Sequence, residues 1–436
     1  MTDKIKYAEL ELPNYTNTRP VIGNLSTVDL VKAAVLAPLN VLLIGDRGTG
    51  KTQLVKDVYN SYFGGNKAEG GEGIFIRAHP EIDVYNEIFT ELDLERAKRK
   101  LTGNIDALLY AVDELNRAPT VAQNQFFGLG DGIMDYQGRS ILLGRNGYRL
   151  LMATANLGNG TFQGTFETDE ALHNRLHVTL DLDYEMFKPT VSDKLGIRHK
   201  GAVNPNVKEA EKKDLSDKVV AASREISERT LDPGIEASAV ANYIEFGLDN
   251  CMKNQRKGKI WPLDCQGCSH NADAAGAVCS YIRSPVERTM QAMIKYATAL
   301  DFIAKLKNPD QSTDAVELMF KSFELTGAYQ SLLNPMLLRQ DYLDQNPKFM
   351  AAVVEKLKED FRRNEDFILT SIEQARVGNK VVNFFENDGV LGDYDSLSPS
   401  LRQKFSKIEP YSNNREIGLG WMNDYVDFLR EINGKK

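Results

Sequence analysis

Eight consecutive residues have the types and the spacing needed to hold a row of phosphate groups. They are Gly45, Asp46, Arg47, Gly48, Thr49, Gly50, Lys51 and Thr52, directly after the apolar run 41–44. The segment matches the pattern G-x-x-x-x-G-K-[ST], whose glycines let backbone N–H groups surround phosphates. Lys51 would contact the β- and γ-phosphates, the Thr52 hydroxyl would bind Mg²⁺, and the next helix would add its positive dipole end. The segment therefore predicts a nucleotide site.

A pair of carboxylates at the end of another apolar segment could complete this chemistry. Residues 107–112 are typical of a buried strand, and Asp113 and Glu114 follow directly. Phosphoryl transfer to water needs one group that holds Mg²⁺ and another that orients the attacking water. We assign Asp113 to Mg²⁺, through a water molecule, and Glu114 to the role of general base. The alternative is a solvated acidic turn after a buried strand.

An alternation of short apolar runs with longer amphipathic segments would position these groups. The strand candidates are residues 41–44, 74–77, 107–112, 149–154 and 178–180. Strands that alternate with helical segments are typical of an α/β fold with a parallel sheet. The sequence therefore predicts this fold class, with both candidate motifs placed directly after strands.

Other segments predict a hairpin and several helices. Residues 133–142 are typical of a β-hairpin, and residues 235–252 have helical periodicity. A further helix is expected over 285–306, with Ser284 as its N-cap and a proline in its first position. Residues 310–436 show helical stretches and polar loops but no strand signal. We therefore expect the C-terminal part to be helical.

Six short segments follow one another in an order that one known family shares. They are residues 21–23, 45–52, 113–119, 153–156, 170–176 and 284–288. Together they resemble the MoxR family of AAA+ ATPases, which belongs to the helix-2-insert clade, and the resemblance covers roughly residues 20–330. The string Asp-Glu-Leu-Asn-Arg-Ala-Pro at 113–119 is fairly specific. The resemblance implies an AAA+ α/β/α P-loop NTPase core with a helical lid, and a hairpin at 133–143 that projects toward a ring pore.

The resemblance also implies roles for four further residues. Asn156 matches sensor 1, which orients the lytic water, and Arg175 matches the arginine finger, which acts on ATP held by the neighbouring subunit. Arg288 matches sensor 2, which reaches the γ-phosphate from the lid; the family usually reads Ser-Pro-Arg there, and Arg283 is the alternative. Gly23 lies where the family has its adenine-contacting turn.

We expect four parts in the chain. Residues 1–20 form an irregular N-terminal arm, and residues 21–190 form the AAA+ nucleotide-binding core. Residues 191–330 form the helical lid, which contains a cysteine-rich insert at 251–279. Residues 331–436 form an α-helical C-terminal extension, for which the family offers no counterpart.

The resemblance implies an ATPase that converts ATP and water into ADP and phosphate. ATP would bind between the subunits of a homo-oligomeric ring, expected to be a hexamer. The ring would remodel or mature a partner protein, which in this family often has a von Willebrand factor A (VWA) domain. An AAA+ nucleic-acid motor or restriction-type translocase is the alternative, and a nucleotide-gated scaffold with little turnover is a third.

The cysteines of the chain are unusual in their placement. All four lie in one short window, as Cys251, Cys265, Cys268 and Cys279. Their spacing predicts a four-thiolate site for a structural Zn²⁺, with His270 as an alternative fourth ligand. An iron–sulfur cluster and metal-free thiols remain open as alternatives.

The composition favours a protein that works apart from membranes and nucleic acid. The formal net charge of the 436 residues is −8, which gives no electrostatic reason to expect nucleic-acid binding. No apolar stretch is as long as a membrane span, and the first six residues are polar, unlike a signal peptide. We therefore expect a cytoplasmic protein.

Overall fold

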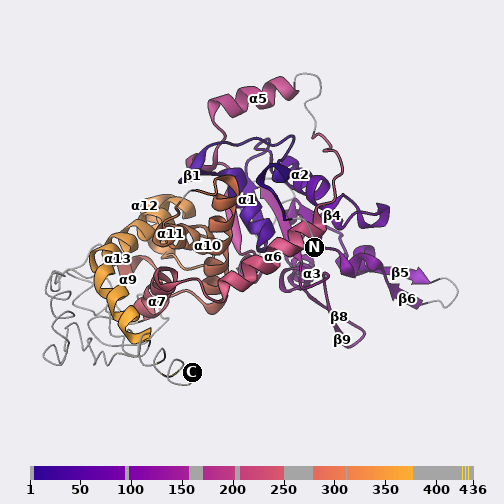
Figure 1. Cartoon of the computed structure of the whole chain (residues 1–436). Coiled ribbons are helices and arrows are strands. Elements are labelled where there is room, and N and C mark those ends of the chain that lie inside the picture. The colour runs from indigo at the N-terminus through magenta and orange to yellow at the C-terminus, as the bar shows by residue number, and fades with distance from the viewer. Residues whose placement is uncertain are drawn as a thin grey trace, which may run out of the picture. The chain divides into compact units, whose positions relative to one another are not determined.

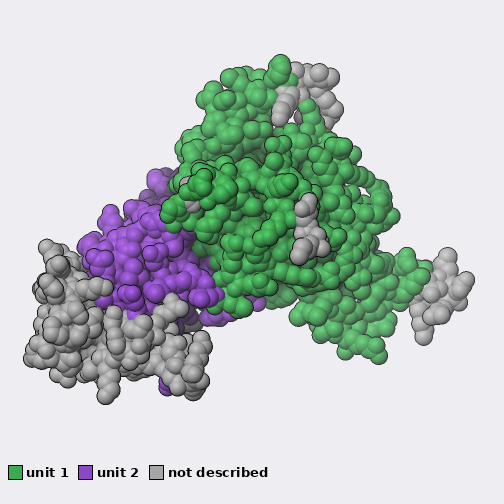
Figure 2. Space-filling view, viewed as in Figure 1, with its two compact units in different colours: residues 1–231, 295–313 green, residues 232–294, 314–436 purple. Residues whose placement is uncertain are grey.

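The structure, a computed structural model, describes residues 4–93, 98–156, 170–201, 207–249, 278–310 and 312–376, together with the single positions 425, 428 and 431. Its contacts divide the chain into two compact units, each built from two segments (Figure 2). Unit 1 comprises Met1–Leu231 and Lys295–Thr313, and unit 2 comprises Asp232–Ile294 and Asp314–Lys436. The four-part division expected from the sequence stays a prediction.

Five parallel strands form the central sheet of unit 1 (Figure 1). In sheet order they are β11 (Val178–Asp181), β3 (Val41–Gly45), β10 (Leu150–Asn156), β7 (Leu109–Asp113) and β4 (Gly73–Arg77). Every residue of β3 and β7 is buried, as expected for parallel strands that are covered on both faces. The five predicted strands are therefore confirmed, with small differences at their ends.

The register of this sheet brings the predicted functional segments to one edge. Gly45, where the phosphate loop begins, is paired with Asn156 at the end of β10. Val112 of β7 is paired with Ala153 of β10, so that Asp113 follows at the same edge. Ligands of open parallel sheets bind at the carboxyl ends of the strands, and both candidate motifs lie there.

Helices pack against this sheet and against one another in unit 1. In chain order they are α1 (Thr27–Leu36), α2 (Lys51–Phe63), α3 (Thr120–Asp131), α4 (Glu170–His173), α5 (Val191–Gly201) and α6 (Ser216–Thr230). Helix α2 starts in the phosphate loop and contacts β3, β4, β7 and β10, while α1 contacts α6. This arrangement gives unit 1 the predicted α/β architecture. Helix α5 was not expected, and its apolar residues Val191 and Leu195 are exposed.

The irregular N-terminal arm is packed into unit 1. Its apolar side chains Ile5, Leu10, Leu12 and Tyr15 are buried. The arm contains the 3₁₀ turn η1 (Tyr7–Leu10) and leads into the antiparallel pair β1 (Pro20–Ile22) and β2 (Leu25–Ser26). The other 3₁₀ turns are η2 (Lys67–Glu69), η4 (Gly103–Asp106), η5 (Leu115–Arg117) and η6 (Glu185–Phe187), and η3 (Tyr85–Phe89) is a short π-helix.

Two hairpins extend unit 1 beyond its sheet. The hairpin of β8 (Ile133–Tyr136) and β9 (Arg139–Leu142) confirms the prediction, and Gln137 and Gly138 at its turn both have positive φ, as a two-residue hairpin turn requires. The hairpin of β5 (Thr90–Asp93) and β6 (Lys98–Leu101) was missed, because its charged residues give no apolar alternation. The Tyr136 hydroxyl donates to the Arg99 carbonyl at 2.8 Å and links the two hairpins.

Unit 2 is helical in its described residues. Its helices are α7 (Ile235–Asp249), α9 (Val278–Tyr281), α11 (Ala315–Gly327), α12 (Pro335–Tyr342) and α13 (Asn346–Arg376). Tyr243, Phe320 and Phe361 form an aromatic core with ring centroids 5.2–6.5 Å apart. No helix in the described ranges is both long and apolar enough to cross a membrane.

The start of α10 (Glu287–Lys307) corrects one prediction. The sequence placed Pro285 in the first turn and Ser284 at the N-cap, but the helix begins two residues later, at Glu287. The Ser284 hydroxyl donates to the Glu245 carbonyl at 3.2 Å. The side chain that resembled a cap therefore links the segment before α10 to α7 within unit 2.

Candidate functional site

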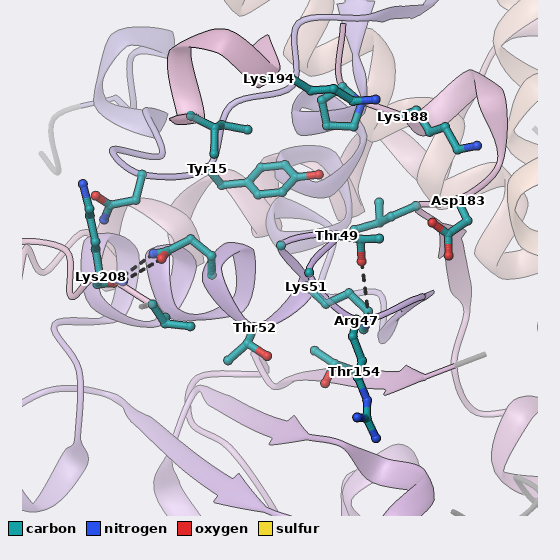
Figure 3. A pocket seen from close by; sticks show the side chains of 18 of the residues that line it. Tyr15, Arg47, Thr49, Lys51, Thr52, Thr154, Asp183, Lys188, Lys194 and Lys208 are labelled. Carbon is teal, nitrogen blue, oxygen red and sulfur yellow. Dashed lines mark hydrogen bonds between the residues drawn. The ribbon is translucent and has the colours of Figure 1, made fainter. Parts of the chain in front are cut away.

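A cavity of about 780 Å³ lies beside the phosphate loop in unit 1 (Figure 3). This volume is in the range of small-molecule and cofactor sites. Its cationic lining residues are Arg47, Lys51, Lys188, Lys194, Arg198 and Lys208, against the carboxylates of Glu114 and Asp183. The excess of positive charge suits a polyanionic ligand such as a triphosphate.

The phosphate loop has a backbone that depends on glycine. Gly48 has φ of 83° and Gly50 has φ of 89°, a region that side chains disfavour. Gly50 also serves as the N-cap of α2, so the first N–H groups of that helix open toward the loop. The predicted loop thus forms a turn that leads into a helix N-terminus, which is the arrangement that binds phosphate.

Lys51 is held inside this loop. Its side chain is buried, and Nζ donates to the carbonyls of Gly45 at 2.8 Å and Asp46 at 2.7 Å. Burial lowers the pKa of Lys51, although the carboxylates of Asp183 and Asp46 act in the opposite direction. An ammonium group that is directed back into the loop is placed to meet a phosphate that the loop encloses.

Hydroxyl groups join the phosphate loop to the carboxylate pair. Thr52 Oγ1 and Thr154 Oγ1 both donate to Asp113 Oδ1, at 2.9 Å and 2.7 Å. Thr154 Oγ1 in turn accepts from the Glu114 backbone N–H at 2.9 Å. Thr154 was not among the predicted site residues. A polar residue within the apolar strand β10, at the carboxyl edge of the sheet, was the signal that could have revealed it.

Oxygen atoms at this edge fit Mg²⁺. The Thr52 hydroxyl and the Asp113 carboxylate are 2.9 Å apart, and hard oxygen donors are the ligands that this cation prefers. The described residues contain no group of three or more His, Cys, Asp or Glu side chains that could hold a metal by themselves. Because Mg²⁺ usually keeps waters and substrate phosphates as ligands, two protein oxygens are sufficient.

The predicted base, Glu114, is paired with an arginine of its own motif. Arg117 Nε and Nη2 lie 2.9 Å and 3.0 Å from the two carboxylate oxygens of Glu114. Glu114 lines the cavity and has φ of 56°, so the backbone turns sharply at this residue. Strained backbone is common at functional sites, where the surrounding structure holds it in place.

Asn156 and Gly23 occupy different places relative to the cavity. Asn156 ends β10 and lines the cavity, and the Asn116 side chain donates to its carbonyl at 3.0 Å. Gly23 lies in the turn between β1 and β2, with φ of 52°, and is not among the described residues that line the cavity. The structure therefore brings Asn156, but not Gly23, to the wall of the candidate site.

Arg175 is held against α3 of its own chain. Its Nε lies 2.7 Å from Asp131 Oδ2, its Nη1 donates to the Ala171 carbonyl at 2.7 Å, and its guanidinium covers the Phe127 ring at 4.6 Å. A Cβ at Gly130 would lie 2.8 Å from Arg175 Cβ, so the glycine permits this close approach. Arg175 does not line the described cavity.

The remaining predicted ligands and catalytic groups lie elsewhere. Arg288 belongs to the first turn of α10 in unit 2, and its sensor 2 role stays a prediction. Cys251, Cys265 and Cys268 lie outside the described residues. Cys279 belongs to α9, but its side chain is not described. The zinc site therefore also stays a prediction.

Several cavity residues were missed because distant segments bring them together. Asp183, just after β11, accepts a hydrogen bond from the Asp46 backbone N–H of the phosphate loop. Gln53 on α2 exchanges two hydrogen bonds with the Lys208 backbone, at 2.9 Å and 2.8 Å. Tyr15 reaches the cavity from the N-terminal arm. No local sequence pattern points to these contacts.

Comparisons with known proteins place the fold in a broad class. No protein-family model and no curated protein matches the sequence. A solved structure with a similar fold is the crystal structure of a "putative ATPase" from Cytophaga hutchinsonii, with a TM-score of 0.50 and 14% sequence identity. The match covers 76% of this chain and 88% of that chain. Together with the parallel sheet, this likeness shows that the chain shares the α/β fold of that structure.

Proposed function

We propose that the protein is an AAA+ ATPase that hydrolyses ATP to ADP and phosphate at this cavity. The observation that carries the proposal is the continuous contact from the phosphate loop to the predicted base. Thr52 contacts Asp113, Asp113 contacts Thr154, and Thr154 accepts from the Glu114 N–H. The end of a buried strand thus joins the oxygens expected to bind Mg²⁺ and the backbone N–H of the proposed base in one short network.

The residues divide the work of hydrolysis between binding and chemistry. The loop amides and Lys51 bind the phosphates, while Thr52 and Asp113 hold Mg²⁺, which neutralises charge on the phosphate oxygens when it is bound. Glu114 orients the attacking water and accepts its proton once its carboxylate leaves Arg117. Asn156, at the neighbouring strand end, helps to position that water.

We propose that the active assembly is a ring of identical subunits, as in the MoxR family. Arg175 would act on ATP held by the next subunit of a homo-hexamer, with Arg288 or Arg283 as sensor 2. Two observations support a role outside its own site: Arg175 does not line the described cavity of its chain, and it lies beside α3, whose end leads into the β8–β9 hairpin. The ring would remodel or mature a partner protein, such as one with a VWA domain.

A nucleic-acid motor on the same core receives less support. The β8–β9 hairpin and its flank carry Arg139 and Arg145, and Arg145 pairs with Glu72 at 2.8 Å. On the other hairpin, Lys100 pairs with Glu91 at 3.1 Å. A nucleic-acid backbone is bound by an excess of cations, and Asp131 and Asp135 at this hairpin offset Arg139 and Arg145.

Separate substitutions of the binding and chemical groups test the ATPase proposal. Lys51→Ala should lose ATP affinity, whereas Glu114→Gln should keep ATP bound and lower hydrolysis by about 10²- to 10⁴-fold. Glu91→Gln, on the β5 strand, is the matched control and should change neither. ATP binding is measured by calorimetry and turnover by phosphate release. A Glu114→Gln variant that turns over ATP at the normal rate would exclude the proposed base.

We also propose that the four cysteines hold one structural Zn²⁺ per chain. Their gathering into residues 251–279 supports this, because a shared cation explains such clustering in a reducing compartment. Elemental analysis of protein purified without added metal should find zinc in the parent protein and less in a Cys265→Ser/Cys268→Ser variant. Parent protein without zinc or iron would contradict the metal site.

A further inference from the structure

The turn that follows β11 brings Asp183 to the phosphate loop. The Leu182 N–H donates to the Ile44 carbonyl at 2.9 Å, near the end of β3. Within the turn, the Asp183 N–H donates to the Asp181 carboxylate at 2.9 Å. Asp183 lines the cavity, and Figure 3 shows its side chain on the side of the cavity where Thr49 lies. A segment outside every predicted motif thus places a carboxylate beside the loop.

The carboxylate of Asp183 contacts the backbone where the phosphate loop begins. Its Oδ2 accepts a hydrogen bond from the Asp46 N–H. Gly45 makes room for this contact, because a Cβ at this position would lie 3.2 Å from the same oxygen. Gly45 also has φ of 149°, a backbone conformation that side chains disfavour. The first glycine of the motif therefore permits both the turn of the chain and the approach of the carboxylate.

One peptide unit joins Asp183 to Lys51. Its N–H, that of Asp46, donates to Asp183, and its carbonyl, that of Gly45, accepts from Lys51 Nζ at 2.8 Å. A trans peptide unit is planar, so its N–H and its carbonyl point in opposite directions and turn together. A carboxylate that holds the N–H on one side therefore also holds the carbonyl that orients the Lys51 ammonium on the other.

The charge of Asp183 acts on Lys51 as well. Burial lowers the pKa of Lys51, and Asp183 is the largest of the charges that act to raise it. The other carboxylates that act in this direction are Asp46, Asp113 and Glu114. Asp183 could thus serve the loop through its hydrogen bond or through its charge, and an isosteric substitution separates the two.

We propose that Asp183 is a positioning residue, whose hydrogen bond holds the first peptide unit of the phosphate loop, and through it Lys51, in the form that binds nucleotide. The inference rests on the proposed ATPase function and adds a role for a residue that no motif indicated. A carboxylate repels phosphate, so Asp183 acts on the loop and not on the nucleotide. Where fewer molecules hold the loop in its binding form, the apparent affinity falls by the same factor.

Two substitutions of Asp183 separate the hydrogen bond from the charge. Asp183→Ala removes both and should bind ATP about tenfold or more weakly, as measured by calorimetry. Asp183→Asn removes the charge, but its amide oxygen still accepts from the Asp46 N–H, so it should bind ATP within about threefold of the parent. Glu185→Ala is the control: its side chain is 74% exposed, and its removal takes away one nearby negative charge without a contact to the loop. This variant should bind ATP normally.

Turnover and melting temperature distinguish positioning from a general structural role. Asp183→Ala should raise KM and leave kcat within about twofold, because bound ATP restores the loop and the proposed base lies at the end of another strand. Its melting temperature without nucleotide should stay within about 3 °C of the parent, since water can replace the half-buried carboxylate as acceptor.

The outcomes separate this inference from the proposed function. Parent-like affinity in Asp183→Ala would overturn the role of Asp183 while the ATPase proposal stands. An equal loss of affinity in Asp183→Asn would assign the effect to charge and overturn positioning by the hydrogen bond. A lower kcat with unchanged KM, or a strongly lowered melting temperature with normal affinity, would also overturn it. A parent protein that binds no ATP would overturn both proposals.

Discussion

The two sides of the cavity are built in different ways. On the phosphate-loop side, Asp113 and Thr154 are aligned by the register of two neighbouring strands, and Thr52 belongs to the helix that follows the phosphate loop. On the arm side, Tyr15 has no regular backbone around it and depends on the buried acceptor Asp57. In regular structure, backbone hydrogen bonds already hold a motif in position. An irregular segment lacks these bonds and needs buried polar side chains as partners to be held as rigidly.

The two arginines near the motifs also differ in an instructive way. Arg117 pairs with the predicted base Glu114, which lines the cavity, while Arg175 pairs with Asp131 at the end of α3. Each guanidinium is paired with a carboxylate of its own chain. The two arginines differ in how their side chains are packed. Arg175 is packed on Phe127 and Gly130, whereas the side chain of Arg117 is 45% exposed.

The largest expected effect concerns the phosphate-loop side and its proposed completion by an arginine of a neighbouring subunit. Arg175→Ala should lower ATP hydrolysis by about 10³-fold or more and spare ATP binding, because an arginine finger stabilises charge in the transition state. Mixing Arg175→Ala with Glu114→Gln subunits should restore some activity, since some interfaces regain both groups. Arg363→Ala, on α13, is the control. Mixed rings that are confirmed by mass and still inactive would contradict action in trans.

A second test asks whether the arm side depends on its anchor. Asp57→Ala leaves the Asn14 and Tyr15 N–H groups without their acceptor and should lower the free energy of unfolding by about 2–4 kcal/mol. It should also weaken ATP binding, because Tyr15 loses its position. Lys51→Ala should weaken ATP binding with much less loss of stability. Urea unfolding and calorimetry measure the two quantities. If both variants lost the same free energy of unfolding, the proposed difference between the arm side and the phosphate-loop side would be contradicted.

A third test uses pH to probe a second anchor of the arm. The buried Asp29 accepts from the Tyr7 hydroxyl at 2.6 Å and pairs with Lys32 at 3.2 Å and Lys307 at 2.8 Å. Burial acts to raise the pKa of Asp29, but these partners outweigh it and bring the pKa from 3.8 to about 2. Because the folded pKa is the lower one, the stabilisation is complete above pH 3.8 and is lost as pH falls toward 2.

The size of this effect follows from the shift in the pKa of Asp29. It corresponds to about 2 kcal/mol of the free energy of unfolding, measured as stability against pH between 5 and 2. Asp29→Asn should flatten that part of the curve, and the exposed Asp310→Asn should not. A wild-type slope in Asp29→Asn would show that the acid sensitivity arises elsewhere.

The smallest expected effect concerns Arg117. Because its pair with Glu114 is partly exposed, we expect the pair to contribute no more than about 1 kcal/mol. Arg117→Ala should therefore raise the basal ATPase rate by no more than about fivefold, since the base is released more readily. Steady-state phosphate release measures this. A lower rate would mean that Arg117 contributes to catalysis rather than competing for the base.

The sequence by itself determined the phosphate loop, the five strands and the β8–β9 hairpin. Each of these depends on a local pattern: glycines before a helix, apolar runs of strand length, or a glycine turn between short strands. The link between Asp113 and the phosphate loop was also predictable, because both motifs follow parallel strands. Composition and spacing could not reveal α5, the charged β5–β6 hairpin or the true start of α10, which begins at Glu287.

Only the tertiary structure decided which distant residues complete the site. Thr154 faces Asp113 because of strand register, Tyr15 reaches the phosphate loop because Asp57 holds the arm, and Asp183 meets the loop at the end of β11. These contacts join residues far apart in the chain, and their energies come from burial and from hydrogen bonds that exist only after folding. A local sequence pattern cannot predict these contacts, because it depends only on residues that are close together in the chain.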